Sequence, residues 1–279
     1  MFSLVSSRTI RGVLVLVLGL GCAVAANAQQ QTYLGFDRND YPGDTNLNSL
    51  RQTFSYTGYW LNNPPGAMSN GWVGKRPVLE AAGFGFVVLF NGRLYDELKR
   101  SPEGFGELDG HDAVAAAKRE GFPANTIIFL DIEEGGRMPP EQKAYIYRWV
   151  DEVSGAGFRA GVYCSGIPVR EDRNTTIITA DDIRADAQGR QITYWVTNDA
   201  CPPSPGCTFP KNPPNPAESK LPYADIWQFV QSPKRLEFAR KCGGYNVGDG
   251  NCYPPGLDPG LHVHVDVNTA NSPDPSRGR

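Results

Sequence analysis

The stretch IIFLDIEEGG, residues 127–136, is an apolar, β-branched run that ends in two carboxylates two residues apart. A short run of this kind, closed by glycines, is typical of a buried strand in a parallel sheet. Side chains at positions i and i+2 of a strand point to the same side, so Asp131 and Glu133 are predicted to share a face. Burying two acids is costly unless partners, water or chemistry justify it. The stretch therefore predicts a sheet and a site at its edge.

Further strand-like runs occur along the chain, separated by helical stretches. Such alternation indicates a parallel sheet with crossover helices, and eight strands in about 250 residues predict a single-domain (β/α)8 barrel of the TIM type. The helices are predicted at 45–54, 75–82, 111–121, 140–157 and 179–188, with a short candidate at 235–241. The strands are predicted at 32–37, 57–62, 84–90, 126–133, 158–164, 192–197, 224–230 and 262–268.

The N-terminus has the pattern of a removable secretion signal. Arg8 and Arg11 precede the apolar run VLVLVLGLG, and Ala26-Asn27-Ala28 offers a small-x-small cleavage site. Cys22 could instead be a lipidated cysteine, but Gly19 stands where that signal needs a bulky aliphatic residue. No other segment is long and apolar enough to span a membrane. We expect a signal peptide over 1–28, a barrel over 29–270, a disordered tail over 271–279 and a secreted or periplasmic location.

Charge and motifs exclude several classes of function. The formal net charge is −3, and removal of Arg8 and Arg11 would make it −5, with no basic stripe to hold nucleic acid. No glycine-rich phosphate loop follows a strand, and there is no G-x-S-x-G elbow. Ser165 has no evident histidine partner. We therefore expect no nucleic-acid partner, no cofactor and no serine-hydrolase chemistry.

If the protein is exported, its cysteines are expected to be oxidised. Cys201 and Cys207 bracket the Pro-rich turn CPPSPGC, and Cys242 and Cys252 bracket the Gly-rich loop CGGYNVGDGNC. Both couples are predicted to form disulfides that staple long loops. Cys164 follows the apolar run RAGVY and is predicted to be a buried free thiol. Zinc binding is disfavoured, because neither couple has the tight spacing of zinc ligand pairs.

Polar and aromatic side chains gather where the predicted strands end, which is where barrels of this kind carry their chemistry. Acids from the first, fourth and eighth strands can converge there, because the first and eighth are neighbours in a closed barrel and the fourth faces them. Aromatic faces among carboxylates suit pyranose rings and glycosidic bonds. The strand-end residues are Asp37, Asp40, Asn62, Asn91, Arg93, Asp131, Glu133, Glu134, Tyr163, Ser165, Trp195, Asn198, Asp199, Trp227, Gln228, Asp266 and Asn268.

The ordered set GFD, LDIE, GVYCSG, YWVT, IWQF and VDVN resembles the strand-end signatures of glycoside hydrolase family 25, the lysozyme-type muramidases. The chain is more similar still to exported glycoside-hydrolase-like domains of unknown function related to that family. The stretches that carry this second resemblance are GYWLN, VLEAAGFGFVVLF, GHDAVAAAKREGFP followed by TIIFLDIE, and FRAGVYCSG. The resemblance spans residues 33 to about 268 and rests on the order and spacing of the motifs.

The resemblance implies a barrel that hydrolyses glycosidic bonds in an amino-sugar polymer such as peptidoglycan. It places the general acid at Glu133, beside Asp131, which would orient the substrate N-acetyl group or stabilise developing positive charge. Asp37 and Asp266 would line the same pocket as supporting carboxylates. The predicted substrate-binding residues are Asn62, Asn91, Arg93, Tyr163, Trp195, Asn198, Trp227 and Gln228.

Structural roles for the acids stay open beside the catalytic ones. Asp131 and Glu133 would form a structural pair if backbone amides or Arg93 bound them. Asp37 would cap a turn near residues 43–45. Asp266 would simply close the barrel against the first strand.

Two further alternatives concern the whole site. His262, His264 and Asp266 alternate on one predicted strand face and could ligate a metal, although His111 is predicted to lie far away and we expect no bound metal. The related domains of unknown function often lack a full catalytic set. The chain would then be a non-catalytic cell-wall or glycan-binding barrel.

Overall fold

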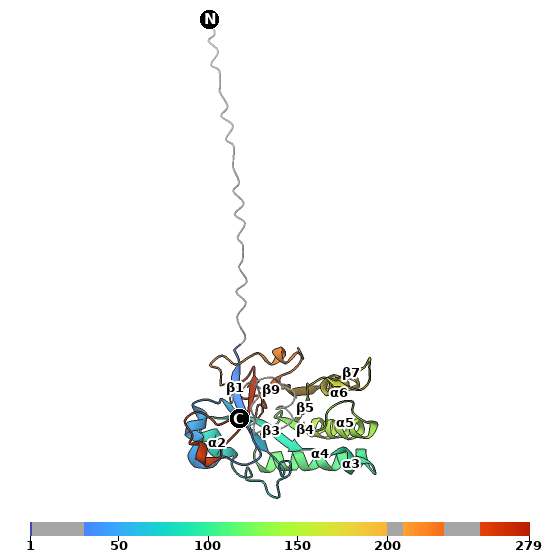
Figure 1. The fold of residues 1–279 in the computed structure, drawn as a ribbon, viewed down its shortest axis with the longest axis horizontal. Helices are drawn as coiled ribbons and strands as arrows, with labels where there is room; N and C mark the ends of the chain where they lie inside the picture. The colour runs from blue at the N-terminus through green and yellow to red at the C-terminus, as the bar shows by residue number, and fades with distance from the viewer. Residues whose placement is uncertain (2–30, 200–208, 232–251) are drawn as a thin grey trace.

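The computed structural model describes residues 31–199, 209–231 and 252–279, together with Met1. Eight strands close into a barrel in the order β1-β10-β9-β8-β5-β4-β3-β2 (Figure 1). The predicted eight-stranded α/β barrel is therefore confirmed. The strands are β1 (Tyr33–Asp37), β2 (Tyr56–Trp60), β3 (Gly85–Asn91), β4 (Ile127–Asp131), β5 (Arg159–Ser165), β8 (Ile192–Thr197), β9 (Ile226–Val230) and β10 (Asp266–Ala270).

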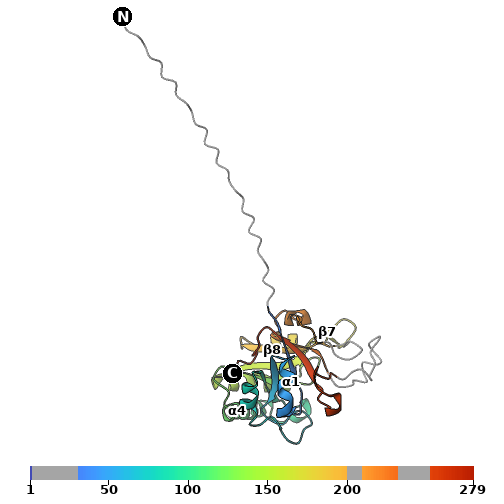
Figure 2. The same ribbon diagram turned by 90° about the vertical axis from the view of Figure 1, so that its left-hand side faces the viewer.

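The all-parallel arrangement of a (β/α)8 barrel is wrong for the last strand. Every pair from β1 round to β9 is parallel, whereas β10 is antiparallel to both β9 and β1, as the red and blue strands of Figure 2 show. A parallel return needs a crossover, usually a helix. Within residues 252–265, the described part of the connection, the regular structure is a 3-10 turn at Pro259–Leu261. The helical candidate at 235–241 lies outside the described residues.

We call the end of the barrel where the parallel strands finish the mouth, and the opposite end the bottom. Because β10 enters from the mouth, Asp266 lies there as the first residue of its strand, paired in register with Asp37. The predicted neighbourhood of these two acids is thus correct, although the predicted strand direction is not.

The helices surround the parallel strands, and α4 packs along α5. The sequence pattern predicts a helix from residue 111, but α4 begins nine residues earlier, at Pro102. Its early turns contain glycines because α5 lies close: a Cβ at Gly106 would stand 2.6 Å from the carbonyl oxygen of Tyr145. No helix of the described residues is long and apolar enough to cross a membrane. The helices are α1 (Leu47–Arg51), α2 (Arg76–Ala81), α3 (Tyr95–Leu98), α4 (Pro102–Arg119), α5 (Pro140–Gly155) and α6 (Thr179–Ala185), with 3-10 turns at Asp44–Asn46 and Pro216–Ser219 and a hairpin of β6 (Val169–Arg170) and β7 (Thr176–Ile177).

The C-terminal residues 271–279 are ordered at the bottom of the barrel, so the prediction of a disordered tail is wrong. The backbone of Ser276 donates to Phe86 O at 2.8 Å and accepts from Ile127 N at 2.7 Å, which joins the tail to the starts of β3 and β4. The Ser276 hydroxyl also accepts from Val88 N at 2.9 Å. Low hydrophobicity suggested disorder, but this segment is held by hydrogen bonds to strand ends rather than by apolar burial.

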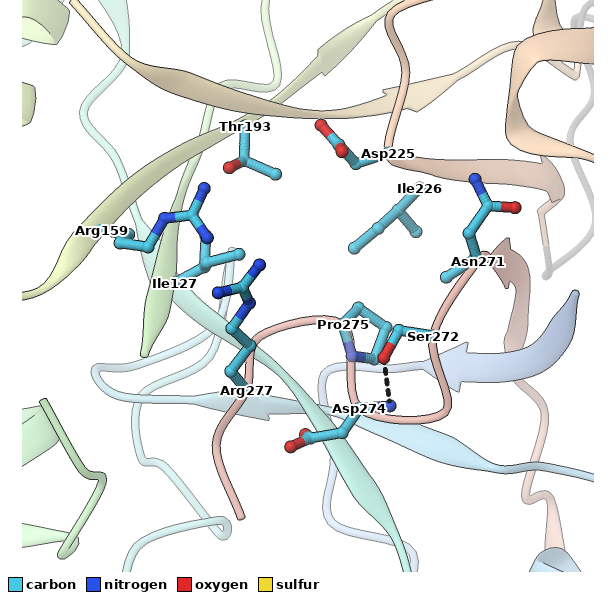
Figure 3. A pocket seen from close by; sticks show the side chains of 11 residues that line it. Ile127, Arg159, Thr193, Asp225, Ile226, Asn271, Ser272, Asp274, Pro275 and Arg277 are labelled. Carbon is cyan, nitrogen blue, oxygen red and sulfur yellow. Dashed lines mark hydrogen bonds between the residues drawn. The ribbon is translucent and has the colours of Figure 1, made fainter. Parts of the chain in front are cut away.

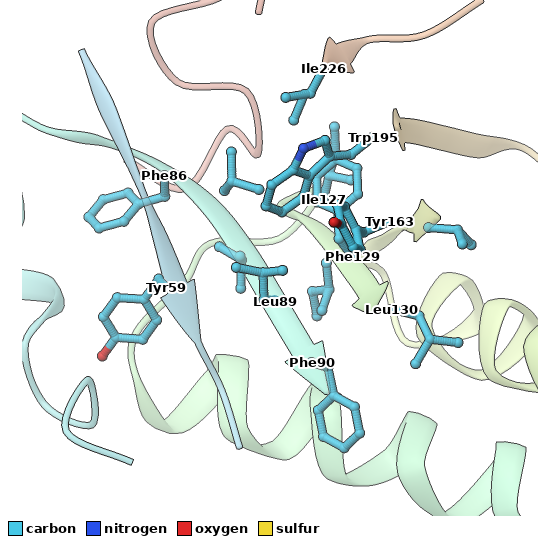
Figure 4. Packing of buried hydrophobic residues seen from close by; sticks show 14 of the residues in the cluster. Tyr59, Phe86, Leu89, Phe90, Ile127, Phe129, Leu130, Tyr163, Trp195 and Ile226 are labelled. Carbon is cyan, nitrogen blue, oxygen red and sulfur yellow. The ribbon is translucent and has the colours of Figure 1, made fainter. Parts of the chain in front are cut away.

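The barrel interior is aromatic where it approaches the mouth. The Trp195 ring lies 4.7 Å from that of Tyr163 and 5.9 Å from that of Phe129, in edge-on contacts between rings from three strands (Figure 4). Cys164, next to Tyr163, is buried and free, as predicted.

Some predictions fall on residues that the structure does not describe. The signal peptide over 1–28 lies almost wholly outside the described residues, as do Cys201, Cys207 and Cys242. Cys252 is buried. Both disulfides stay predictions.

Candidate functional site

The mouth of the barrel gathers the four predicted acids. Asp131 is the last residue of β4. Glu133, which the sequence placed in the strand, lies two residues beyond its end and is exposed. Asp37 ends β1, and Asp266 begins β10. These acids surround one phenol: burial and then the charges of Glu133, Asp131, Asp37 and Asp266 hold the pKa of the Tyr163 hydroxyl well above its usual value. The predicted convergence of acids from the first, fourth and eighth strands is therefore present in the fold.

A network of hydrogen bonds holds Asp37 in place. Its Oδ1 accepts from Asn268 Nδ2 at 2.7 Å and from Gln228 Nε2 at 3.1 Å. Those two amides are held in turn, because Trp195 Nε1 donates to Asn268 Oδ1 at 2.9 Å and the Tyr163 hydroxyl donates to Gln228 Oε1 at 2.7 Å. Side chains from β1, β5, β8, β9 and β10 thus form one connected unit. Asp37 is oriented by this unit and does not cap the turn near residues 43–45.

Gln228 also connects Asp37 to Asp266. Its Nε2 lies 3.4 Å from Asp266 Oδ2, so one amide faces both carboxylates. Gln228 is 1% exposed and Trp195 is equally buried, so neither offers a free face to a sugar ring. Both predicted substrate-binding residues act on the site by positioning other groups.

Asp131 is the least satisfied group at the mouth. It is 3% exposed, and neither carboxylate oxygen has a hydrogen-bond partner. Burial, followed by the charges of Glu133 and Asp37, raises the pKa of Asp131 well above its usual value. Burial therefore favours the protonated form of this carboxyl. The structural alternative, in which backbone amides or Arg93 bind the pair, is wrong for Asp131, because no hydrogen bond reaches its carboxylate and the Arg93 guanidinium binds Asp109.

Asp37 differs from Asp131 because it has partners. The pKa of Asp37 is raised to about 6, because burial and the charge of Glu133 raise it by more than the hydrogen bonds from Asn268 and Gln228 lower it. Gly58 of the neighbouring strand makes room for this side chain, since a Cβ there would lie 2.8 Å from the Asp37 Cβ. The mouth therefore combines a buried acid whose surroundings favour the protonated form with one whose pKa is about 6.

Three predicted binding residues lie where the ends of β2 and β3 face α4, and one of them, Asn91, pairs in register with Asp131. Arg93 donates to both oxygens of Asp109 at 2.7 Å. Asn62 Nδ2 donates to Asn91 O at 3.0 Å, and Asn91 N donates to Asn62 Oδ1 at 2.7 Å. All three line a separate cavity of about 430 Å³. The hydrogen bonds of Asn62 and Asn91 join the ends of β2 and β3, and those of Arg93 join the segment after β3 to α4.

Asn198 and Trp227 also make local contacts. Asn198 Nδ2 donates to Ser219 O at 2.6 Å, and its own carbonyl accepts from Trp227 Nε1 at 3.3 Å. The Trp227 ring packs against Phe229, 5.6 Å between centroids. A role for this pair in binding substrate stays a prediction.

Two residues that lie close to Asp37 or to its hydrogen-bond network were not predicted from the sequence. Tyr56 is fully buried, its hydroxyl has no hydrogen-bond partner, and burial and then Asp37 raise its pKa. Gln231 Nε2 donates to Gln228 Oε1 at 2.9 Å and to Thr197 Oγ1 at 2.7 Å. Tyr56 begins its strand and Gln231 follows one, so a search limited to strand ends missed both. Both roles depend on strand register and contacts between distant residues, so no local signal in the sequence identified them.

Beside Asp37 and Asp266, the mouth opens into a cavity of about 290 Å³. His264 lines it, but His262 and His264 do not lie on a strand, because β10 begins only at Asp266 and His262 has a left-handed backbone with φ 53°. Among residues 31–199, 209–231 and 252–279, no three His, Cys, Asp or Glu side chains are grouped to hold a metal ion. The predicted alternation of metal ligands on one strand face is wrong. The remaining residues that line the cavity are Arg38, Asn39, Asp40 and Val265.

Solved structures with the same fold include three bacterial proteins. An uncharacterized protein of B. stearothermophilus aligns with a TM-score of 0.53 and 21% identity, covering 85% of this chain and 95% of its own. The Tat-secreted protein Rv2525c of Mycobacterium tuberculosis gives 0.51 and 14%, covering 88% and 96%. The spore cortex lytic enzyme SleM of Clostridium perfringens gives 0.50 and 17%, covering 86% and 68%.

Sequence comparison places the chain in a family. A search of curated proteins finds no match. A family model does match residues 63–231, more than half of the chain, and this range contains Asp131, Glu133, Tyr163 and Gln228. The resemblance to glycoside-hydrolase-like domains is thereby confirmed. This chain belongs to the family of Rv2525c-like, glycoside hydrolase-like domains.

Proposed function

We propose that this protein is an exported glycoside hydrolase that cleaves an amino-sugar polymer such as peptidoglycan. The observation that carries the proposal is Asp131, a buried carboxyl without a partner among three further acids. Such a group destabilises the fold, and unpaired acids with shifted pKa values cluster at functional sites. The glycoside hydrolase-like family and the spore cortex lytic enzyme of the same fold support a glycan substrate. The N-terminal pattern and the Tat-secreted relative support export.

In this proposal each acid has a separate role. Glu133, exposed at the mouth, protonates the glycosidic oxygen as the bond breaks. Asp131 keeps its proton and donates a hydrogen bond to the carbonyl oxygen of the substrate N-acetyl group. Asp37, ionised above a pKa of about 6, stabilises the positive charge that develops on the sugar ring. Asp266, beside it, adds a second carboxylate to the same wall.

The test is hydrolysis by the purified protein beside Glu133→Gln. Both are incubated with peptidoglycan and with a panel of amino-sugar polymers, and new reducing ends are identified by mass spectrometry. Loss of a general acid lowers the rate by about 10²–10⁴-fold, so the variant should give almost no product. Glu134→Gln is the matched control, because that neighbouring carboxylate accepts from Tyr95 N at 2.7 Å and an amide oxygen can replace it. Equal activity of the native protein and Glu133→Gln would rule out the role of Glu133.

A second candidate function is a non-catalytic glycan-binding barrel. The observation in its favour is the exposure of Glu133, because an exposed acid is not kept protonated by burial. In that case peptidoglycan would pull down the native protein and Glu133→Gln equally, and neither would release products. Products from the native protein alone would exclude this second function.

A further inference from the structure

The bottom of the barrel contains a cavity of about 220 Å³, here called the bottom cavity. Strand starts form one wall, with Ile127 and Arg159 as the first residues of β4 and β5. The other wall is the C-terminal segment, which passes from Asn271 to Arg277 (Figure 3). The bottom cavity therefore lies at the opposite end of the barrel from the acids of the mouth. Its properties do not depend on the proposed hydrolysis.

Two arginines face each other across the bottom cavity, and the charge of Arg159 lowers the pKa of the nearby Asp225. The side chains of Arg159 and Arg277 both point into it in Figure 3. Among residues 31–199, 209–231 and 252–279, neither guanidinium makes a hydrogen bond or a salt bridge. Two like charges pointing into one small space repel each other unless an anion separates them. This is an arrangement that binding of an anion would stabilise.

The carboxylates that line the bottom cavity are bound to other groups. Asp274 accepts from Phe86 N at 2.8 Å, Gly278 N at 3.2 Å and Arg279 N at 3.1 Å. Asp225 accepts from the backbone N–H of Tyr194 at 3.2 Å. Both acids accept backbone N–H groups, and Arg159 acts on Asp225 through its charge without a direct ion pair, so both guanidinium groups keep hydrogen-bond donors for a ligand.

We infer that the bottom cavity binds a phosphate group between Arg159 and Arg277. The planar guanidinium fork matches the oxygens of a phosphate, and two forks can bind different oxygens of one group. Thr193 and Asn271 border the same space and supply neutral hydrogen-bond donors. The volume exceeds the roughly 30 Å³ of a water molecule several times over, which leaves room for a phosphate and part of what it is attached to. A phosphodiester polymer held here would leave the mouth free.

Calorimetric titration tests this site with two probes, inorganic phosphate and poly(glycerol phosphate). The purified protein is compared with Arg159→Gln and Arg277→Gln. Each substitution removes one of two charged donors and should weaken binding about tenfold or more. Arg100→Gln is the matched control, because it removes the same charge from an exposed position outside the cavity and should bind as the native protein does. Added salt should weaken binding.

The outcomes separate the sources of the phosphate. Binding of both probes supports a site for any phosphate group, and binding of the polymer alone assigns the site to a phosphodiester. The inference is overturned if neither probe binds, or if Arg100→Gln weakens binding as much as the cavity variants do. Thermal unfolding shows whether each variant is folded. Arg277 is exposed and its side chain has no hydrogen bond or salt bridge to the described part of the chain, so Arg277→Gln keeps the test decisive even if Arg159→Gln does not fold.

Discussion

Two acids at opposite ends of this barrel, Asp274 at the bottom and Asp131 at the mouth, differ in their hydrogen-bond partners. At the bottom, Asp274 accepts three backbone N–H groups and connects the C-terminal segment to β3. At the mouth, Asp131 is more deeply buried and accepts none. A carboxylate with donors stabilises a fold, whereas a carboxyl without them destabilises it. The difference identifies the mouth as the end where stability is given up for function.

Removing residues 271–279 should have the largest effect on this comparison. The truncation deprives Phe86, Val88 and Ile127 of hydrogen-bond acceptors at the buried starts of two strands. At about 1 kcal/mol or more for each lost bond, the free energy of unfolding should fall by several kcal/mol. Urea unfolding followed by circular dichroism measures it. Ser276→Ala, which keeps the backbone bonds and loses only the hydroxyl, should lower stability by only about 1 kcal/mol. An unchanged midpoint for the truncated protein would show that the segment is not structural.

The mouth should make the protein less stable as pH rises. The pKa of Asp37 is 3.8 in the unfolded chain and about 6 in the folded protein, so the folded state holds this proton more tightly. The stability it contributes is complete below about pH 4 and is lost as pH rises through about 6, a change of about 3 kcal/mol. Asp131 acts in the same direction. Urea midpoints measured between about pH 4 and 8 test this. Asp37→Asn should flatten the profile, and a native profile that rises with pH would contradict the assignment.

Asp131→Asn should stabilise the protein at neutral pH while it impairs hydrolysis. The unfolded chain ionises Asp131 at neutral pH whereas the buried site disfavours the charge, and an amide, which is never ionised, avoids this penalty on folding. The melting temperature should rise about 2–4 °C for each kcal/mol regained at neutral pH and change little near pH 4, where the native acid is protonated. Asp96→Asn is the control, because Asp96 is an exposed acid paired with Lys99 and its replacement should not stabilise. A less stable Asp131→Asn at neutral pH would mean that the carboxylate has a stabilising partner.

The sequence predicted the barrel and its acids because both depend on local patterns. Apolar runs specify strands, and acids at their ends can be read from the order of residues, as with Asp37 and Asp131. The direction of β10 was not predictable in this way, because it depends on whether a connection crosses the barrel. Asp266 was placed correctly only because closing the barrel brings the first and last strands together in either direction.

Contacts between distant residues explain the remaining errors. Arg93 looked like a site residue until the fold paired it with Asp109, sixteen positions away on α4. Residues 271–279 looked disordered because hydrogen bonds to strands about 150 to 190 positions away leave no mark on local composition. Tyr56, at the start of a strand, became part of the mouth only because its long side chain lies inside the barrel beside Asp37.

The smallest predicted effect compares two buried tyrosines near Asp37. Tyr163→Phe removes a hydrogen bond of 2.7 Å to Gln228, so the free energy of unfolding should fall by about 1 kcal/mol. Tyr56→Phe removes a buried hydroxyl that has no partner, so it should leave stability unchanged or raise it. Urea unfolding of both variants tests the difference. Equal losses would mean that the hydroxyls do not matter and only packing was disturbed. A loss confined to Tyr163→Phe would show that the network around Gln228 holds Asp37 in place by hydrogen bonding.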